Sequence, residues 1–162
     1  MAESKRTPTL FLMVGLPGAG KTTLARKLEA ECPALRLTPD EWIPMLYGEN
    51  LSQEKLDSVR DPVEQMQRQV AAAALRLGVD VVLDFGLWSR VEQDDFRAWA
   101  AALGARAEIC FLDVSHAELS ARLAARNANL PPGTFHVSRE QLDLWWSWFE
   151  APTTDELSSE TA

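Results

Sequence analysis

Short apolar runs alternate along this chain with longer stretches in which apolar residues recur every three or four positions. The first pattern is typical of buried strands, and the second is typical of amphipathic helices. The apolar runs predict strands at residues 10–14, 35–37, 79–84 and 107–112. The helical pattern, together with capping signals, predicts helices at residues 22–31, 53–77 and 91–103 and others that begin at Thr38, Ser115 and Ser138. Strands that alternate with helices through short connections predict an α/β fold, in which a parallel sheet has helices on both faces.

Three of the helix starts have the residue spacing of a capping box. In this motif a Ser or Thr side chain caps the third helical residue, whose Glu or Gln side chain caps the Ser or Thr backbone in return. The predicted pairs are Thr38 with Glu41, Ser115 with Glu118, and Ser138 with Gln141.

Length and composition favour one compact domain. The chain has 162 residues, of which 46% are hydrophobic and 25% are charged, as is common in globular proteins. The formal net charge of −8 offers no basic stripe for a phosphate backbone, so a nucleic-acid partner is not expected. The N-terminal residues before the first strand lack the apolar segment of a secretion signal, and no run approaches membrane-spanning length. Two cysteines without metal-ligand spacing agree with the expected cytoplasmic location.

A phosphate-binding motif follows the first strand directly. Residues 15–22 read Gly-Leu-Pro-Gly-Ala-Gly-Lys-Thr, which fits the pattern G-x-x-x-x-G-K-[ST]. Backbone N–H groups must wrap a phosphate chain, and side chains at the glycine positions would block that approach. Lys21 adds a mobile positive charge, Thr22 adds a hydroxyl group suited to Mg²⁺, and the helix that follows favours anions at its N-terminus. The candidate nucleotide-binding residues here are Gly15, Pro17, Gly18, Ala19, Gly20, Lys21, Thr22 and Thr23.

Two aspartates fall where predicted strands end. Asp40 lies in the first helical turn after the second strand, and Asp84 closes the third strand. Ligands of open parallel sheets bind at the carboxyl ends of the strands, so both carboxylates are expected beside the phosphate loop, where Asp84 could hold Mg²⁺ directly or through water. Asp40 could instead serve only the helix start, and Asp84 could cap only the next turn.

Arginines flank the clearest loop of the chain, at residues 127–137. Arg122 and Arg126 are spaced i, i+4 and therefore lie on one helix face, and Arg139 follows the loop. The combination is typical of a lid, although any one of these arginines could simply be solvated.

Candidate acceptor contacts lie near the two aspartates. Trp42 and Trp88 could wall an acceptor pocket beside Asp40 and Asp84, or could equally pack in the core, and Arg90 is close to Trp88 in the sequence.

These residues together resemble P-loop kinases. The arrangement is similar to the 5′-kinase domain of polynucleotide kinases, chloramphenicol phosphotransferase and zeta-toxin-type sugar-nucleotide kinases, from about Leu10 to Pro152. The resemblance implies a P-loop NTPase three-layer αβα sandwich with a helical lid, and ATP and Mg²⁺ as cofactors. The kinase domain would span residues 1–152, and residues 153–162 would form an acidic, disordered tail.

The same resemblance implies roles for individual residues. Lys21 and Thr22 would serve ATP and Mg²⁺, and Asp40 would be the general base that takes the proton of the acceptor hydroxyl. Residues 149–152, Phe-Glu-Ala-Pro, resemble the segment that borders the adenine, which adds Pro152 to the nucleotide-binding candidates. The implied catalytic residues are Lys21, Asp40 and the lid arginines Arg122 and Arg126.

Two features depart from polynucleotide kinases. Residues 85–88, Phe-Gly-Leu-Trp, follow Asp84 where those kinases tend to have polar residues, which argues against a nucleic-acid substrate. The family also has a final strand after Pro152, but Leu157 is the only strongly apolar residue of this tail. We therefore expect a sheet of four strands, or of five if the tail supplies a vestigial strand.

The leading functional prediction is ATP-dependent phosphorylation of a hydroxyl group on a small molecule, such as an antibiotic or a metabolite. A nucleotide or polynucleotide 5′-hydroxyl kinase is the alternative enzyme, and an ATP-binding regulatory module without transfer is the alternative from another class. The sequence indicates no membrane partner and no particular oligomeric state.

Overall fold

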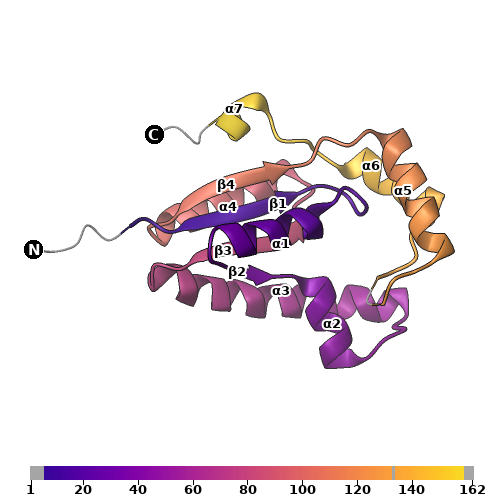
Figure 1. Ribbon diagram of the computed structural model, residues 1–162, viewed down its shortest axis with the longest axis horizontal. Coiled ribbons are helices and arrows are strands. Elements are labelled where there is room, and N and C mark those ends of the chain that lie inside the picture. The colour runs from indigo at the N-terminus through magenta and orange to yellow at the C-terminus, as the bar shows by residue number, and fades with distance from the viewer. Residues whose placement is uncertain (1–5, 133, 159–162) are drawn as a thin grey trace, which may run out of the picture.

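Strands and helices alternate through most of the chain, as the apolar pattern predicts. The computed structural model describes residues 6–132 and 134–158 (Figure 1). The strands are β1 (Thr9–Val14), β2 (Ala34–Leu37), β3 (Asp80–Gly86) and β4 (Arg106–Phe111). The helices are α1 (Lys21–Glu31), α2 (Pro39–Tyr47), α3 (Gln53–Arg76), α4 (Arg90–Ala102), α5 (His116–Ala128), α6 (Arg139–Trp148) and α7 (Thr154–Ser158).

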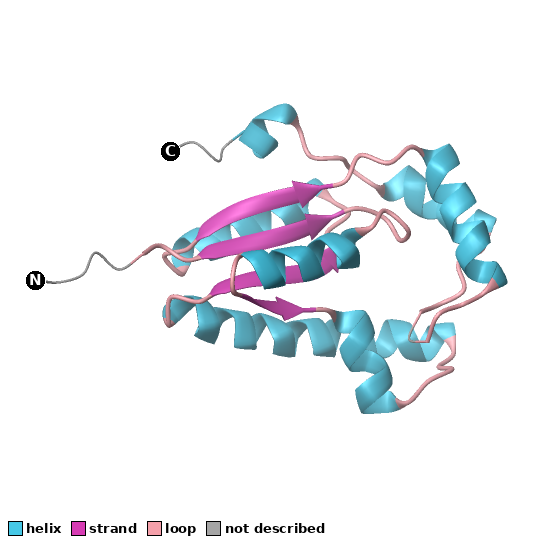
Figure 2. Ribbon diagram, in the orientation of Figure 1, coloured by secondary structure: helices cyan, strands magenta, loops and turns pink. Residues whose placement is uncertain are grey.

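The four strands form one parallel sheet in the order β2-β3-β1-β4. β1 lies in the middle, where Leu12 is in register with Leu83 of β3 and with Ile109 of β4. All six residues of β1 are buried, which explains its continuous apolar run. Because the strands are parallel, their carboxyl ends meet at one edge of the sheet, where the arrowheads point in Figure 2.

Helices cover both faces of the sheet and give the three-layer αβα architecture. On one face, Phe11 of β1 packs in a cluster with Ala25 of α1. On the other face, Leu12 lies in a larger cluster with Ala71 of α3 and Ala100 of α4. The helices α5 and α6 lie beyond the carboxyl edge of the sheet, where a lid would be placed (Figure 1). None of the described helices combines the length and the apolar character needed to cross a membrane.

β3 extends two residues beyond its predicted end. The strand continues through Phe85 to Gly86, which is in register with Val14 of β1. Asp84 therefore lies inside the strand and does not close it. The apolar pattern could not reveal this, because the pairing partner of Gly86 is 72 residues away in the sequence.

The segment after Pro152 forms a helix, so the prediction of a disordered tail is wrong for residues 154–158, and residues 159–162 lie outside the described part. In the described chain the sheet has four strands, and no fifth strand forms. Thr153 donates its backbone N–H to the buried carboxylate of Glu156 at the start of α7, and Leu157 packs against the main core. The packing of Leu157 and the ion pair between Glu156 and Arg90 hold this short helix on the domain.

The predicted capping boxes have different outcomes. Ser138 and Gln141 form one, as predicted. Ser115 caps the N–H of Glu118, but the Glu118 side chain pairs with Arg122 instead of returning to the backbone. The box predicted at Thr38 is wrong, because its hydroxyl group bonds elsewhere and makes no cap.

We predict that Gly86→Ala destabilises the protein more than Gly104→Ala does. Both glycines have positive φ, at 96° and 72°, so alanine is strained at each by about 1 kcal/mol. Only at Gly86 would the new Cβ also meet atoms at 3.3 Å, the carbonyl oxygen of Gly15 and Nε1 of Trp88. Urea unfolding should show an additional loss of about 1 kcal/mol or more for Gly86→Ala. Equal losses in the two variants would contradict this contact.

Candidate active site

The loop at residues 15–22 connects β1 to α1 with the geometry of an anion site. Gly18 and Gly20 have φ values of 86° and 96°, which favour glycine. Gly20 is also the N-cap of α1, and it has no side chain to occupy the first N–H groups of the helix. Those donors and the positive end of the helix dipole are therefore available to phosphate groups.

Lys21 is half-buried and curls back over the loop. Its ammonium group donates to the carbonyl oxygen of Leu16 at 3.0 Å. Burial lowers the pKa of Lys21, the carboxylates of Asp84 and Asp40 oppose this shift, and Arg126 adds to it. Asp84, Asp40 and Arg126 are therefore among the charged groups that act on the motif lysine.

Asp84 joins two strands and a helix through its buried carboxylate. Its Oδ2 accepts hydrogen bonds from the hydroxyl groups of Thr22, at 2.7 Å, and Thr38, at 3.2 Å. Its Oδ1 is buried without a hydrogen-bond partner among the described residues. A free carboxylate oxygen next to the Thr22 hydroxyl group fits Mg²⁺, which proteins often bind through one carboxylate, the nucleotide phosphates and water.

Asp40 is held by a partner that the sequence did not reveal. It lies at the exposed start of α2, and its Oδ1 accepts a hydrogen bond from Arg60 Nη2 of α3 at 2.7 Å. Arg60 also lies 3.6 Å from Glu64, one helical turn further along. The i, i+4 spacing of Arg60 and Glu64 is visible in the sequence, but the contact with Asp40 depends on how α2 packs against α3.

Glu64 is the most perturbed carboxyl group near this site. Burial raises its pKa from the ordinary value of 4.5 to about 7; Arg60 opposes the shift, and Asp61 and Glu92 contribute to it. Glu64 pairs with Arg60 on its own helix, and a pKa of about 7 makes its charge sensitive to pH near neutrality.

The lid arginines contact the site from α5. Arg122 donates to the carbonyl oxygens of Gly18 and Ala19 at 3.3 and 3.4 Å, so it reaches the phosphate loop directly. Arg126 donates to the carbonyl oxygen of Phe135 at 3.1 Å, and its buried Nε has no partner among the described residues. Burial lowers the pKa of Arg126, and Asp40 opposes this shift.

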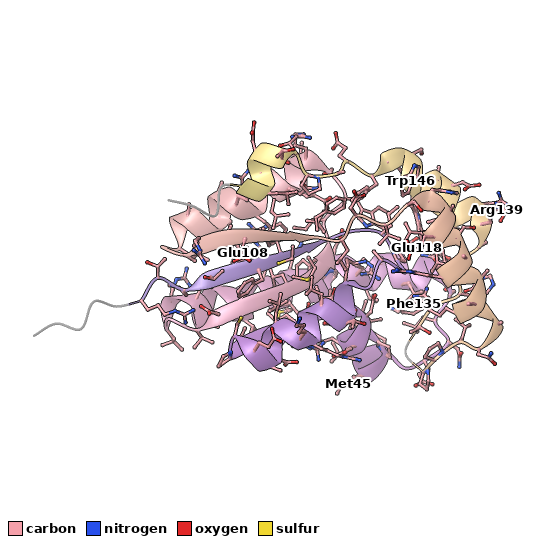
Figure 3. The ribbon with its side chains drawn as sticks, turned by 45° about the horizontal axis from the view of Figure 1, so that its top comes forward. Met45, Glu108, Glu118, Phe135, Arg139 and Trp146 are labelled. Atoms are coloured by element: carbon pink, nitrogen blue, oxygen red, sulfur yellow. The ribbon has the colours of Figure 1, made fainter. Side chains whose placement is uncertain are left out.

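The lid packs firmly on the phosphate loop. Leu119 and Leu123 of α5 share an apolar cluster with Leu16 and Ala19. Figure 3 shows Phe135 on the inner side of α5, toward the sheet, whereas the exposed Arg139 lies on the outer side. The structure therefore brings Arg122 and Arg126 to the site, but not Arg139.

A cavity of about 230 Å³ adjoins the phosphate loop on the β4 side. Phe149 stacks on Phe111 there, with ring centroids 6.0 Å apart. Pro152 is buried but does not line this cavity, whereas Trp146, which was not among the candidate site residues, does. The lining consists of Gly15, Leu16, Ala19, Phe111, Leu112, Asp113, Val114, Leu119, Trp146, Phe149 and Ala151.

The candidate acceptor contacts are used mainly in packing. Trp42 is partly buried between two apolar clusters, and Trp88 packs against Trp145 with ring centroids 5.4 Å apart. Arg90 pairs with Glu156 of α7 at 3.2 Å, so its guanidinium group holds the C-terminal segment. Thr23 is exposed at the start of α1.

The chain is similar to a known family and to a curated protein. The profile of the AAA_33 family, described as an AAA domain, matches residues 10–152. The signal recognition particle protein of Synechocystis sp. is 35% identical over 96 residues, which are 51% of this chain and only 20% of that protein.

Several solved structures share the fold. A Chloroflexus aurantiacus protein provisionally described as a kinase is 21% identical, with a TM-score of 0.73, and the match covers 91% of this chain and 83% of that one. A chain of the Pnkp1/Rnl/Hen1 RNA repair complex is 21% identical, with a TM-score of 0.68 and coverage of 91% and 45%. A gluconokinase from Sinorhizobium meliloti is 19% identical, with a TM-score of 0.58 and coverage of 93% and 79%. The resemblance to P-loop kinases is thereby confirmed for the fold.

We predict that Glu64→Gln stabilises the protein at alkaline pH. A carboxyl group whose pKa is raised to about 7 binds its proton more tightly in the folded than in the unfolded chain, so stability falls as pH rises from 4.5 to 7. The neutral amide removes this loss. Urea unfolding at pH 8 should show a gain of about 2 kcal/mol, and at pH 4 little change. A variant that is destabilised at pH 8 but not at pH 4 would show that the ion pair with Arg60 outweighs burial.

Proposed function

The chain belongs to the AAA_33 family of AAA domains, and we propose that it transfers the γ-phosphoryl group of ATP to a hydroxyl group of a small molecule. The observation that carries this proposal is the position of two aspartates at the edge of the sheet that bears the phosphate loop. Asp84 accepts hydrogen bonds from Thr22 of the loop and from Thr38, and Asp40 lies in the first turn of the helix that follows Thr38. A phosphate loop alone would serve any nucleotide-binding protein. Phosphoryl transfer to a hydroxyl group also requires a general base, and the Asp40 carboxylate, which pairs with Arg60, would supply it.

ATP would bind across the carboxyl edge of the sheet. The free N–H groups at the start of α1 and the ammonium group of Lys21 would hold the β- and γ-phosphates. The adenine would occupy the cavity beside Phe149 and Ala151, which agrees with the implied role of that segment. Leu119 and Trp146 would cover the base from the lid, because both line the same cavity.

Thr22 and Asp84 are the residues that would hold Mg²⁺ with the phosphates. When bound, the ion would neutralise phosphate charge and orient the γ-phosphoryl group. The Thr22 hydroxyl group is already fixed on Asp84 Oδ2, and Oδ1 remains available.

Asp40 would act as the general base. The acceptor oxygen would bond to the γ-phosphorus as its proton passes to the Asp40 carboxylate, and the bond from that phosphorus to the β,γ-bridging oxygen would break, releasing ADP. The pairing with Arg60 would hold the Asp40 carboxylate in place. Arg122 and Arg126 would stabilise the charge that develops on the transferred group.

Two alternatives make different predictions. A 5′-hydroxyl kinase of nucleic acid is consistent with the fold, since a chain of an RNA repair complex shares it. Labelling of oligonucleotides alone would favour this enzyme. A regulatory module would bind ATP without transfer, and the pairing of Asp40 with Arg60 beside the phosphate loop argues against it.

The proposal is tested by incubating the protein with ATP, Mg²⁺ and a panel of hydroxylated metabolites, antibiotics and oligonucleotides, followed by mass spectrometry for a gain of phosphate. The Asp40→Asn variant should bind ATP and fold normally, because Asn is nearly isosteric. Its transfer rate should fall by about 100-fold or more, which is the usual contribution of a positioned general base. Lys21→Ala serves as the inactive control. If the Asn variant kept nearly the full rate, Asp40 would not be the base.

We predict that Asp84→Asn weakens ATP binding only when Mg²⁺ is present. The amide can still accept hydrogen bonds from Thr22 and Thr38, but it is a poor Mg²⁺ ligand. Calorimetry should show about tenfold or greater loss of ATP affinity in Mg²⁺ and little change in EDTA. The wild-type protein should lose affinity in EDTA. An equal loss in both buffers would point to a purely structural role for Asp84.

A further inference from the structure

Gln93 of α4 joins two segments that lie far apart in the sequence. Its side chain is buried, and its amide nitrogen donates to the carbonyl oxygen of Leu87 at 3.1 Å and to that of Glu150 at 3.0 Å. Leu87 directly follows β3, and Glu150 lies between α6 and α7. A primary amide has two N–H donors, so one side chain can serve both carbonyl groups. Gln93 is therefore a bridge between the end of β3 and the segment after α6.

The β3 end of this bridge is a fixed point. Leu87 has a φ of 31°, in the left-handed region that residues other than glycine rarely adopt. Such a conformation costs about 1–3 kcal/mol and persists only where the surrounding structure imposes it. Leu87 is 5% exposed and packs in the main core, so packing holds it as well as the bond from Gln93.

The other end of the bridge carries part of the wall of the cavity beside the phosphate loop. Phe149 and Ala151, the two neighbours of Glu150, both line that cavity. In Figure 1 this segment runs from α6 toward α7, past the carboxyl end of β4. It belongs to no helix or strand, so its position depends on bonds to other elements. Besides the bond from Gln93, Glu150 donates its N–H to Trp88 at 2.7 Å, and its Oε2 accepts from the N–H of Arg90 at 2.8 Å.

The fixed point also adjoins the phosphate loop. Gly86, which precedes Leu87, accepts a hydrogen bond from the N–H of Gly15 at 3.0 Å. Gly15 begins the phosphate loop and lines the same cavity. The bridge through Gln93 therefore helps to set where the wall at residues 149–151 stands relative to the phosphate loop.

We infer that Gln93 is a positioning residue for the base of the nucleotide. The inference rests on the proposed function, which puts the base in this cavity. Gln93 does not line the cavity, and it would act through Phe149 and Ala151, which it holds in place against the base. A wall that is already ordered does not have to be ordered by the ligand, so the bridge raises affinity through the base. The phosphate groups, which the loop and Lys21 would bind, gain nothing from it.

The test compares a ligand that has a base with one that has none. Calorimetry in Mg²⁺ gives the affinities of a non-hydrolysable ATP analogue and of inorganic tripolyphosphate for the wild-type protein and for Gln93→Met. Methionine is similar in size to glutamine, and it removes both donors. The affinity for the ATP analogue should fall by about tenfold, whereas that for tripolyphosphate should stay within about twofold.

Gln67→Met is a matched control. Gln67 is a buried glutamine of α3, which covers the same face of the sheet as α4, but its amide has no hydrogen-bond partner among the described residues. The control should leave both affinities unchanged and melt at an equal or higher temperature. Gln93→Met should melt at a lower temperature, because two carbonyl groups lose their donor.

Glu150→Ala tests the same segment by a change at an exposed position, where folding is not at risk. It removes the carboxylate that accepts from the N–H of Arg90. The affinity for the ATP analogue should fall by about threefold, and that for tripolyphosphate should not change. This variant decides the question if Gln93→Met does not fold.

Two results in Gln93→Met would overturn the inference: an equal loss of affinity for both ligands, which indicates a general structural role, and no loss for either. Unchanged affinity of Glu150→Ala for the ATP analogue would overturn it as well. Phosphate transfer is measured separately with ATP. A base-dependent loss of affinity in a protein that transfers no phosphate would overturn the proposed kinase activity and leave the role of Gln93 intact.

Discussion

The hydrogen bonds to the Asp84 carboxylate are the interaction on which the arrangement of the site depends. One of its oxygens accepts hydrogen bonds from Thr22, where β1 has passed into α1, and from Thr38, where β2 passes into α2. One carboxylate of β3 can reach the segments that follow β1 and β2 because the carboxyl ends of these parallel strands lie at the same edge of the sheet. The phosphate loop and the helix that carries Asp40 are thereby fixed relative to each other. Since the carboxylate is buried, each of these bonds is stronger than it would be in water.

Several buried polar atoms of the structure lack a hydrogen-bond partner among the described residues. Asp84 Oδ1, Arg126 Nε and both polar atoms of Gln67 are buried without partners among the described residues, and Glu64 is buried enough to raise its pKa to about 7. Each buried polar group left without a hydrogen bond lowers the stability of the folded chain by about 1–3 kcal/mol. The apolar clusters on the two faces of the sheet, which hold β1 entirely buried, offset that cost.

Local patterns predicted most of the fold. The four strands, the helices between them and the phosphate loop follow from signals that span a few residues, such as apolar periodicity and the glycine spacing of residues 15–22. The predictions that were wrong concern elements whose structure depends on a contact with a residue far away in the sequence. Thr38 bonds to Asp84 rather than capping its helix, β3 continues because Gly86 pairs with Val14, and Leu157 docks a helix where a disordered tail was expected.

The sequence by itself determined the fold class, the phosphate loop, and the presence of Asp40 and Asp84 at the carboxyl edge of the sheet. It could do so because strand direction and loop position are encoded by neighbouring residues. Only the tertiary structure decided that Arg60 holds Asp40 and that Arg90 pairs with Glu156 of α7. These contacts join residues from 20 to 66 positions apart, and they depend on the packing of whole helices, which no local pattern specifies.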